Sequence, residues 1–125
     1  MSTPDIANQA MQIRHSVVTL KSEINDLRND ARSKCEAGIR RSEEIKVLYD
    51  VKVSLRKQRD VAFKNNDATA LLNAENRLAD VRRQIRAKRQ DLSCIAEQLV
   101  SEKDDIEKKA AQYYAAKKKY NDLFV

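Results

Sequence analysis

Histidine and cysteine, the side chains most often used for zinc binding and nucleophilic catalysis, are scarce in this sequence. His15 is the one histidine, and the two cysteines, Cys35 and Cys94, lie far apart in the chain. A catalytic nucleophile needs a base and an orienting group, and a zinc site needs closely spaced Cys or His pairs. Neither arrangement occurs, and a single glycine leaves no glycine-rich phosphate loop. We therefore expect no enzyme activity, no metal, no other cofactor, no small-molecule ligand and two free thiols.

A concentration of cations in the middle of the chain is the one pattern that suggests a binding function. Residues 40–89 contain 14 Lys and Arg against 7 Asp and Glu, whereas all other residues contain 11 against 12. Such a concentration can neutralise the phosphates of RNA or DNA, meet an acidic protein, or form the solvated flank of a helix pair. The candidate basic interaction surface consists of Arg40, Arg41, Arg56, Lys57, Arg59, Arg82, Arg83, Arg86, Lys88 and Arg89.

The elements that would position these cations are predicted to be long helices. Ala, Glu, Lys, Leu and Arg make up 58 of the 125 residues, and Gly and Pro occur once each. This composition is typical of coiled coils and long helices, and it disfavours sheets and turn-rich folds. The sequence therefore predicts an all-α protein.

The first helix is predicted over residues 4–63, approximately. Pro4 occupies a favoured first helical position. Apolar residues then recur at alternating steps of four and three, at Ile6, Ala10, Ile13, Val17, Leu20, Ile24, Leu27 and Ala31. The same phase next reaches Lys34, Gly38 and Arg41, so we expect the apolar repeat to be weakened or shifted there.

The second helix is predicted over residues 69–123, after a turn at about 64–68 that contains Asn65, Asn66 and Asp67. A seven-residue step runs from Leu71 to Tyr120 without a polar residue. Together the two repeats predict an apolar seam along which the helices pack. The candidate seam consists of Ile13, Val17, Leu20, Ile24, Leu27, Leu78, Ile85, Leu92, Leu99 and Ile106.

Because the predicted helices have similar lengths, residues 1–125 are expected to form one domain, a long antiparallel two-helix hairpin that packs as a coiled coil. One unbroken helix in a parallel dimer is the alternative. In the hairpin, residue i lies opposite approximately residue 131 − i, which places Gly38 opposite Ser93 and brings Cys35 close to the level of Cys94. The small residues predict a close approach of the two backbones at Gly38.

Apolar residues outside the seam predict further helix packing, either in a homo-oligomer, as in a helical bundle, or in a larger protein assembly. We therefore expect a non-enzymatic scaffold, adaptor or assembly factor, and alternatively a nucleic-acid-binding hairpin that uses residues 40–89. No apolar run is long enough for a membrane span, and no signal peptide is evident, so a cytoplasmic location is expected.

In outline, a hairpin that acts as a scaffold or adaptor is similar to the coiled-coil stalk proteins of type III export machinery. A hairpin that binds nucleic acid is similar to the tRNA-contacting helical arm of seryl-tRNA synthetases. Both likenesses concern architecture, since no motif in the sequence matches either family.

Overall fold

The computed structural model describes residues 2–125 and contains two helices, α1 (Thr3–Lys64) and α2 (Ala68–Asp122), which pack against each other. These described residues contain no strand, so the predicted all-α helical hairpin is confirmed. Both helices begin and end within one residue of the predicted bounds. A supercoiled packing and self-association remain predictions.

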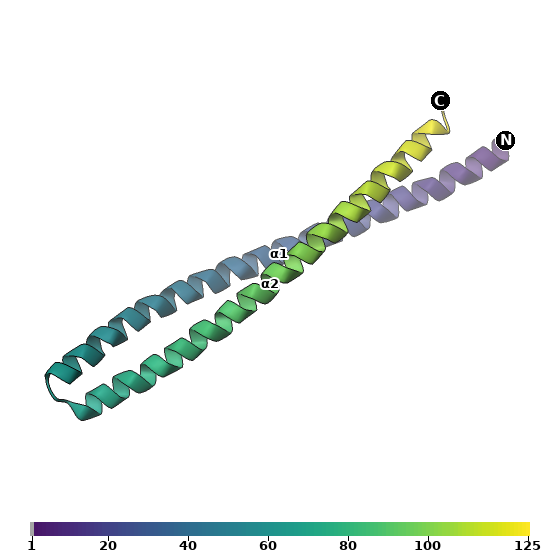
Figure 1. Ribbon diagram of the computed structural model, residues 1–125. Coiled ribbons are helices and arrows are strands. Elements are labelled where there is room, and N and C mark those ends of the chain that lie inside the picture. Colours follow the sequence, from purple (N-terminus) through teal and green to yellow (C-terminus); the bar gives the residue numbers. More distant parts are fainter. Residues whose placement is uncertain (1) are drawn as a thin grey trace. The chain divides into compact units, whose positions relative to one another are not determined.

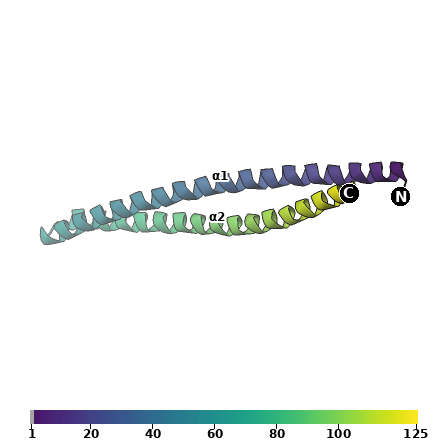
Figure 2. The same ribbon diagram turned by 90° about the horizontal axis from the view of Figure 1, so that it is seen from above.

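The contacts divide the chain into two compact units. The turn unit comprises Cys35–Glu97, and its two helical segments are joined by the turn (Figure 1). The terminal unit pairs the described residues up to Lys34 with Gln98–Val125, so that the segments nearest the two chain ends lie side by side in both views (Figures 1 and 2). Each unit is therefore an antiparallel pair of helical segments.

The turn is built by the polar residues that predicted it. Asn66 adopts a left-handed conformation with φ 53°, which asparagine tolerates better than most residues. Asp67 then caps α2, because its Oδ1 accepts a hydrogen bond from the Ala70 amide at 3.0 Å. The Asp67 amide donates to the Ala62 carbonyl at 2.9 Å and satisfies one of the last acceptors of α1. Asp67 is therefore the N-cap residue of α2.

The seam runs through both units without a change of phase. In α1, each position of the four-and-three repeat from Ile6 to Ala62 is buried or half-buried, and in α2 the same holds from Leu71 to Leu123. After Ala31 the apolar repeat was expected to be either weakened or shifted. The structure shows that it is weakened, because Lys34, Gly38 and Arg41 keep the same phase and are half-buried. We assign heptad position a to Val17 in α1 and to Leu78 in α2, and the other letters follow from these.

The best-buried part of the molecule lies in the turn unit. Leu55 and Leu78 are fully enclosed, and Val81 and Ile85 complete a cluster that Leu48 and Tyr49 cover. Apolar seam residues of both helices face each other here, and Lys52 and Arg59 are the half-buried cations among the α1 seam positions of this stretch. The turn unit therefore holds the main apolar core.

Gly38 lies in the seam of the turn unit, but its small size is not required there. A Cβ added to Gly38 would lie 3.7 Å from Leu92 Cδ1 and 3.7 Å from Ile95 Cγ2, an ordinary van der Waals distance. These residues flank Ser93, so the predicted register is confirmed at this layer. The predicted close approach of backbones is wrong, because the Leu92 and Ile95 side chains fill the space.

Replacing Gly38 with alanine is therefore expected to stabilise the protein by about 1 kcal/mol, the difference in helix propensity between the two residues. Thermal unfolding followed by circular dichroism measures the change. A lower melting temperature would show that the added methyl group does not fit against Leu92 and Ile95.

Candidate interaction surfaces

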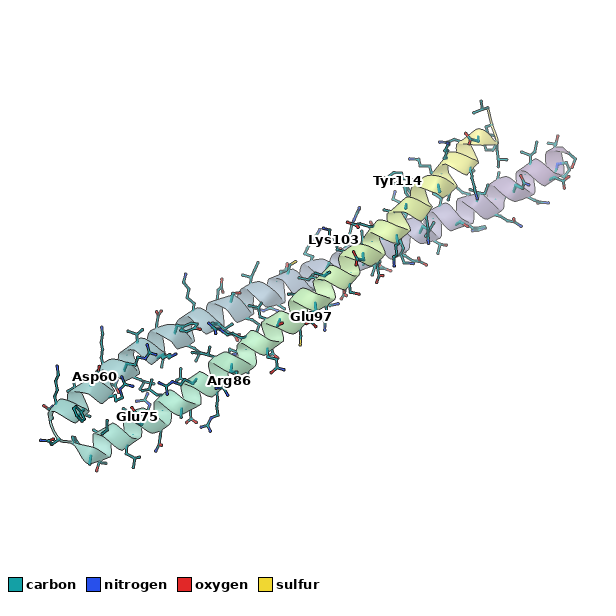
Figure 3. All side chains as sticks on the ribbon, in the orientation of Figure 1. Asp60, Glu75, Arg86, Glu97, Lys103 and Tyr114 are labelled. Carbon is teal, nitrogen blue, oxygen red and sulfur yellow. The ribbon has the colours of Figure 1, made fainter. Side chains whose placement is uncertain are left out.

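Half of the predicted basic interaction surface is committed to contacts within the turn unit. Arg41, Arg59 and Lys88 occupy seam positions and are half-buried. Arg41 pairs through Nη1 with Glu44 Oε2 at 3.0 Å and through Nε with Asp91 Oδ2 at 3.8 Å. Arg59 Nε lies 3.3 Å from Asp60 Oδ1 and 3.5 Å from Glu75 Oε1. Lys88 Nζ lies 2.5 Å from Glu44 Oε2. Three of these pairs join α1 to α2, namely Arg41 with Asp91, Arg59 with Glu75 and Lys88 with Glu44. Figure 3 labels Glu75 on α2 and Asp60 on α1.

Two further members of this surface also have partners inside the unit. Arg83 pairs with Asp80, and Arg89 donates a hydrogen bond to the Tyr49 hydroxyl while lying 5.2 Å from the centre of its ring. The remaining cations are exposed and form no ion pair with any described residue. These cations are Arg40, Arg56, Lys57, Arg82 and Arg86.

The ion pairs shift the ionisation of one carboxylate. Lys88, and after it Arg41, hold the pKa of Glu44 below its ordinary value of 4.5. A lowered folded-state pKa means that folding favours the ionised form, so this contribution to stability is present above about pH 4.5 and is lost as the pH falls through the folded-state pKa.

Glu44→Gln is therefore expected to flatten the fall in melting temperature between about pH 5 and pH 3. The neighbouring Glu43 is exposed and forms no ion pair with a described residue, so Glu43→Gln is the matched control and should retain the wild-type pH dependence. Equal pH profiles for the two variants would contradict the assigned role of Glu44. Melting curves recorded across this pH range measure the effect.

The candidate seam residues all lie at the helix interface. Leu78 and Ile85 in the turn unit, and Val17 and Ile24 in the terminal unit, are buried. The others, which are half-buried, are Ile13, Leu20, Leu27, Leu92, Leu99 and Ile106.

A polar layer interrupts the seam of the terminal unit. Lys34 was expected in the seam phase, but its pairing with Glu102 was not predicted. Lys34 pairs with Glu102 across the two helices and with Asp30 at 2.9 Å on its own helix. Glu102 is only 8% exposed, and its Oε2 atom has no hydrogen-bond partner. The pKa of Lys34 is raised, first by Glu102 and then by Asp30. The sequence does contain a signal for this layer, since Lys34 and Glu102 are opposite charges at seam positions of the two predicted helices.

A second polar pair crosses the terminal unit at a more exposed position. Lys109 Nζ lies 2.6 Å from Glu23 Oε2, and both side chains retain at least a third of their exposure. These pairs order the seam, but they do not form a reactive cluster. Among residues 2–125, no group of three or more His, Cys, Asp or Glu side chains could hold a metal ion, and both cysteines are free and exposed.

No helix in the described part of the chain has the length and apolar character needed to cross a membrane. No protein-family model, curated protein or solved structure matches this chain.

Proposed function

We propose that this chain is a non-enzymatic, cytoplasmic interaction protein that self-associates through its helices and acts as a scaffold, adaptor or assembly factor. The observation that carries the proposal is a second apolar stripe, outside the seam. On α1 the exposed side chains of Met11, Val18, Ile39 and Val53 all occupy heptad position b, and on α2 those of Leu72, Val100 and Tyr114 do the same.

Apolar residues at this spacing favour packing against another helix. Single exposed apolar residues are ordinary on protein surfaces, but residues that repeat in multiples of seven lie along one line of a helix. A two-helix hairpin can cover only one stripe per helix. The second stripe is therefore available to a further helix, as in a bundle.

Light scattering coupled to size-exclusion chromatography tests self-association. At tens of micromolar, the wild-type protein is expected to have a mass above that of one chain, and Val18→Thr combined with Val53→Thr should lower it. Asn25→Thr is the matched control, because Asn25 occupies heptad position b in α1 but is already polar. A wild-type protein that remains monomeric would overturn the proposal.

Nucleic-acid binding is the second candidate function, and it is favoured by the five cations of the candidate basic interaction surface that are exposed and form no ion pair with a described residue. Phosphate binding by these cations would weaken steeply with salt and depend little on base sequence. Gel-shift titration with RNA and duplex DNA at two salt concentrations measures it. Arg82→Glu with Arg86→Glu should abolish binding, whereas Arg83→Glu should have less effect because Arg83 already pairs with Asp80. An absence of binding at low salt would exclude this function.

A further inference from the structure

The two flanks of the terminal unit carry opposite charge, and we infer that this unit stacks side by side on a second copy of the chain, basic face against acidic face. The inference rests on the proposed self-association and specifies its geometry. Heptad positions e and b form one flank of the seam, and positions g and c form the other.

The basic face of the terminal unit is the flank at positions e and b. It carries six exposed cations, with Glu107 as its acid, and none of the six forms an ion pair with a described residue. Arg14 reaches from this flank of α1 to the seam of α2, where its guanidinium lies 5.8 Å from the ring centre of Tyr120. The six cations are Arg14, Lys21, Arg28, Arg32, Lys103 and Lys117.

The acidic face is the opposite flank, at positions g and c, where Lys108 and Lys119 are the cations. Gln9 and Gln12 of α1 line one groove with Lys119 and Asp122 of α2, so both helices contribute to this flank too. The six acids are Asp5, Glu23, Asp26, Asp30, Asp105 and Asp122. Glu23 and Asp30 pair with lysines of the seam, and the other four form no ion pair within the described chain.

The charges on the two faces lie at matching levels. The ion pair between Glu23 and Lys109 shows which levels of the two helices lie opposite each other in this unit. About one turn further along each helix, Asp105 reaches the level of Asp26, and after about one and a half turns Lys103 reaches the level of Arg28. The densest cations and the densest acids therefore occupy the same layer on opposite flanks. A second copy placed alongside in the same register would bring opposite charges together.

The apolar stripe and the charges together decide how the copies face each other. Met11, Val18, Val100 and Tyr114 lie on the basic face, together with its cations; Figure 3 labels Tyr114 and Lys103. Packing two basic faces on each other would cover the apolar residues but would also bring like charges together, which opposes association. Packing the basic face on the acidic face of a neighbour covers the same residues without that repulsion.

The turn unit, taken by itself, has the same polarity. Its e and b flank carries Lys46, Arg56, Arg82, Arg86 and Arg89 against two acids, whereas its g and c flank carries Glu44, Asp80 and Asp91 against two cations. Exposed apolar residues occur on both flanks, with Ile39 and Val53 on the e and b flank and Val47 and Val61 on the g and c flank.

A contact between the basic face of one copy and the acidic face of the next does not close on itself. We therefore expect an open-ended assembly whose mass grows with concentration.

Two variants of equal net charge separate this geometry from a general effect of charge. Lys21→Glu with Arg28→Glu reverses part of the basic face and should weaken association about tenfold or more at low salt. Lys108→Glu with Lys119→Glu removes the same number of cations, but from the acidic face, and should strengthen association. Sedimentation velocity on the full chain at 50 and 500 mM salt measures both, and circular dichroism verifies that the helices are retained.

A complementation experiment tests the facing surfaces directly. Asp26→Lys with Asp105→Lys should also weaken association, but mixing this variant with Lys21→Glu, Arg28→Glu should restore it, because each then offers the charge that the other lacks. A wild-type oligomer whose mass none of these variants changes, or a mixture that fails to associate, would overturn the inference and leave self-association standing. A wild-type protein that is monomeric but binds a polyanion such as RNA would overturn both the stacking geometry and the proposed self-association.

Discussion

Leu78→Ala is expected to lower the free energy of unfolding by about 2–5 kcal/mol, the range found for buried leucine truncations. Leu78 is 0% exposed and packs with Leu55, Val81 and Ile85 between the two helices of the turn unit. Truncation removes the buried methyl groups and leaves a cavity that two long, rigid helices can close only in part. Because few residues of this chain are buried, such a loss is a large fraction of the stability.

Leu72→Ala is the matched control for this experiment. Leu72 lies on the same helix and in the same unit, but it is 63% exposed, so its truncation should change the free energy of unfolding by about 0.5 kcal/mol or less. Urea denaturation followed by circular dichroism at high dilution measures both variants without a contribution from self-association. Similar losses for the two variants would contradict the assignment of the core to the seam.

The helix bounds and the seam could be predicted because local signals agree with the packing. Pro4 lies in the first turn of α1, and Asp67 caps α2. The four-and-three repeat is long enough to define a face without knowledge of the partner helix. The register followed from the position of the turn. These features depend on residues close together in the chain, which is why the sequence contains them in readable form.

The packing at Gly38 and the charge of the two flanks could not be read in the same way. Small size at Gly38 predicted a close backbone approach, but Leu92 and Ile95 reach across and fill the space. The count of 11 cations against 12 acids outside residues 40–89 does not reveal the two faces, because a count along the chain averages cations and acids that lie on opposite flanks. Only the phase of the buried seam separates these two sets. Linear charge density was therefore a poor guide to the surface of the terminal unit.

The pair formed by Lys34 and Glu102 yields the second large effect. Lys34→Met is expected to destabilise the protein, because it removes the cross-helix partner of a carboxylate that is 8% exposed and already has one oxygen without a hydrogen bond. Adding Glu102→Leu should restore much of the stability, since an apolar pair of similar volume replaces a buried charge that would otherwise be unpaired. The double variant should thus melt above the Lys34→Met single variant, and melting temperatures at neutral pH measure the order.

Lys109→Met is the matched control, because Lys109 occupies a seam position of the same unit and pairs with Glu23, whose side chain is 42% exposed. Water can solvate Glu23 when Lys109 is removed, so the loss should be below about 1 kcal/mol. If both lysine variants lose equal stability, the burial of Glu102 is not the cause. If instead Lys34→Met is the less stable of the two and Glu102→Leu rescues it, the polar layer costs stability that an apolar seam would provide. Its retention would then be explained by the register that it fixes, since a charged pair across the seam favours one alignment of the helices over its neighbours one heptad away.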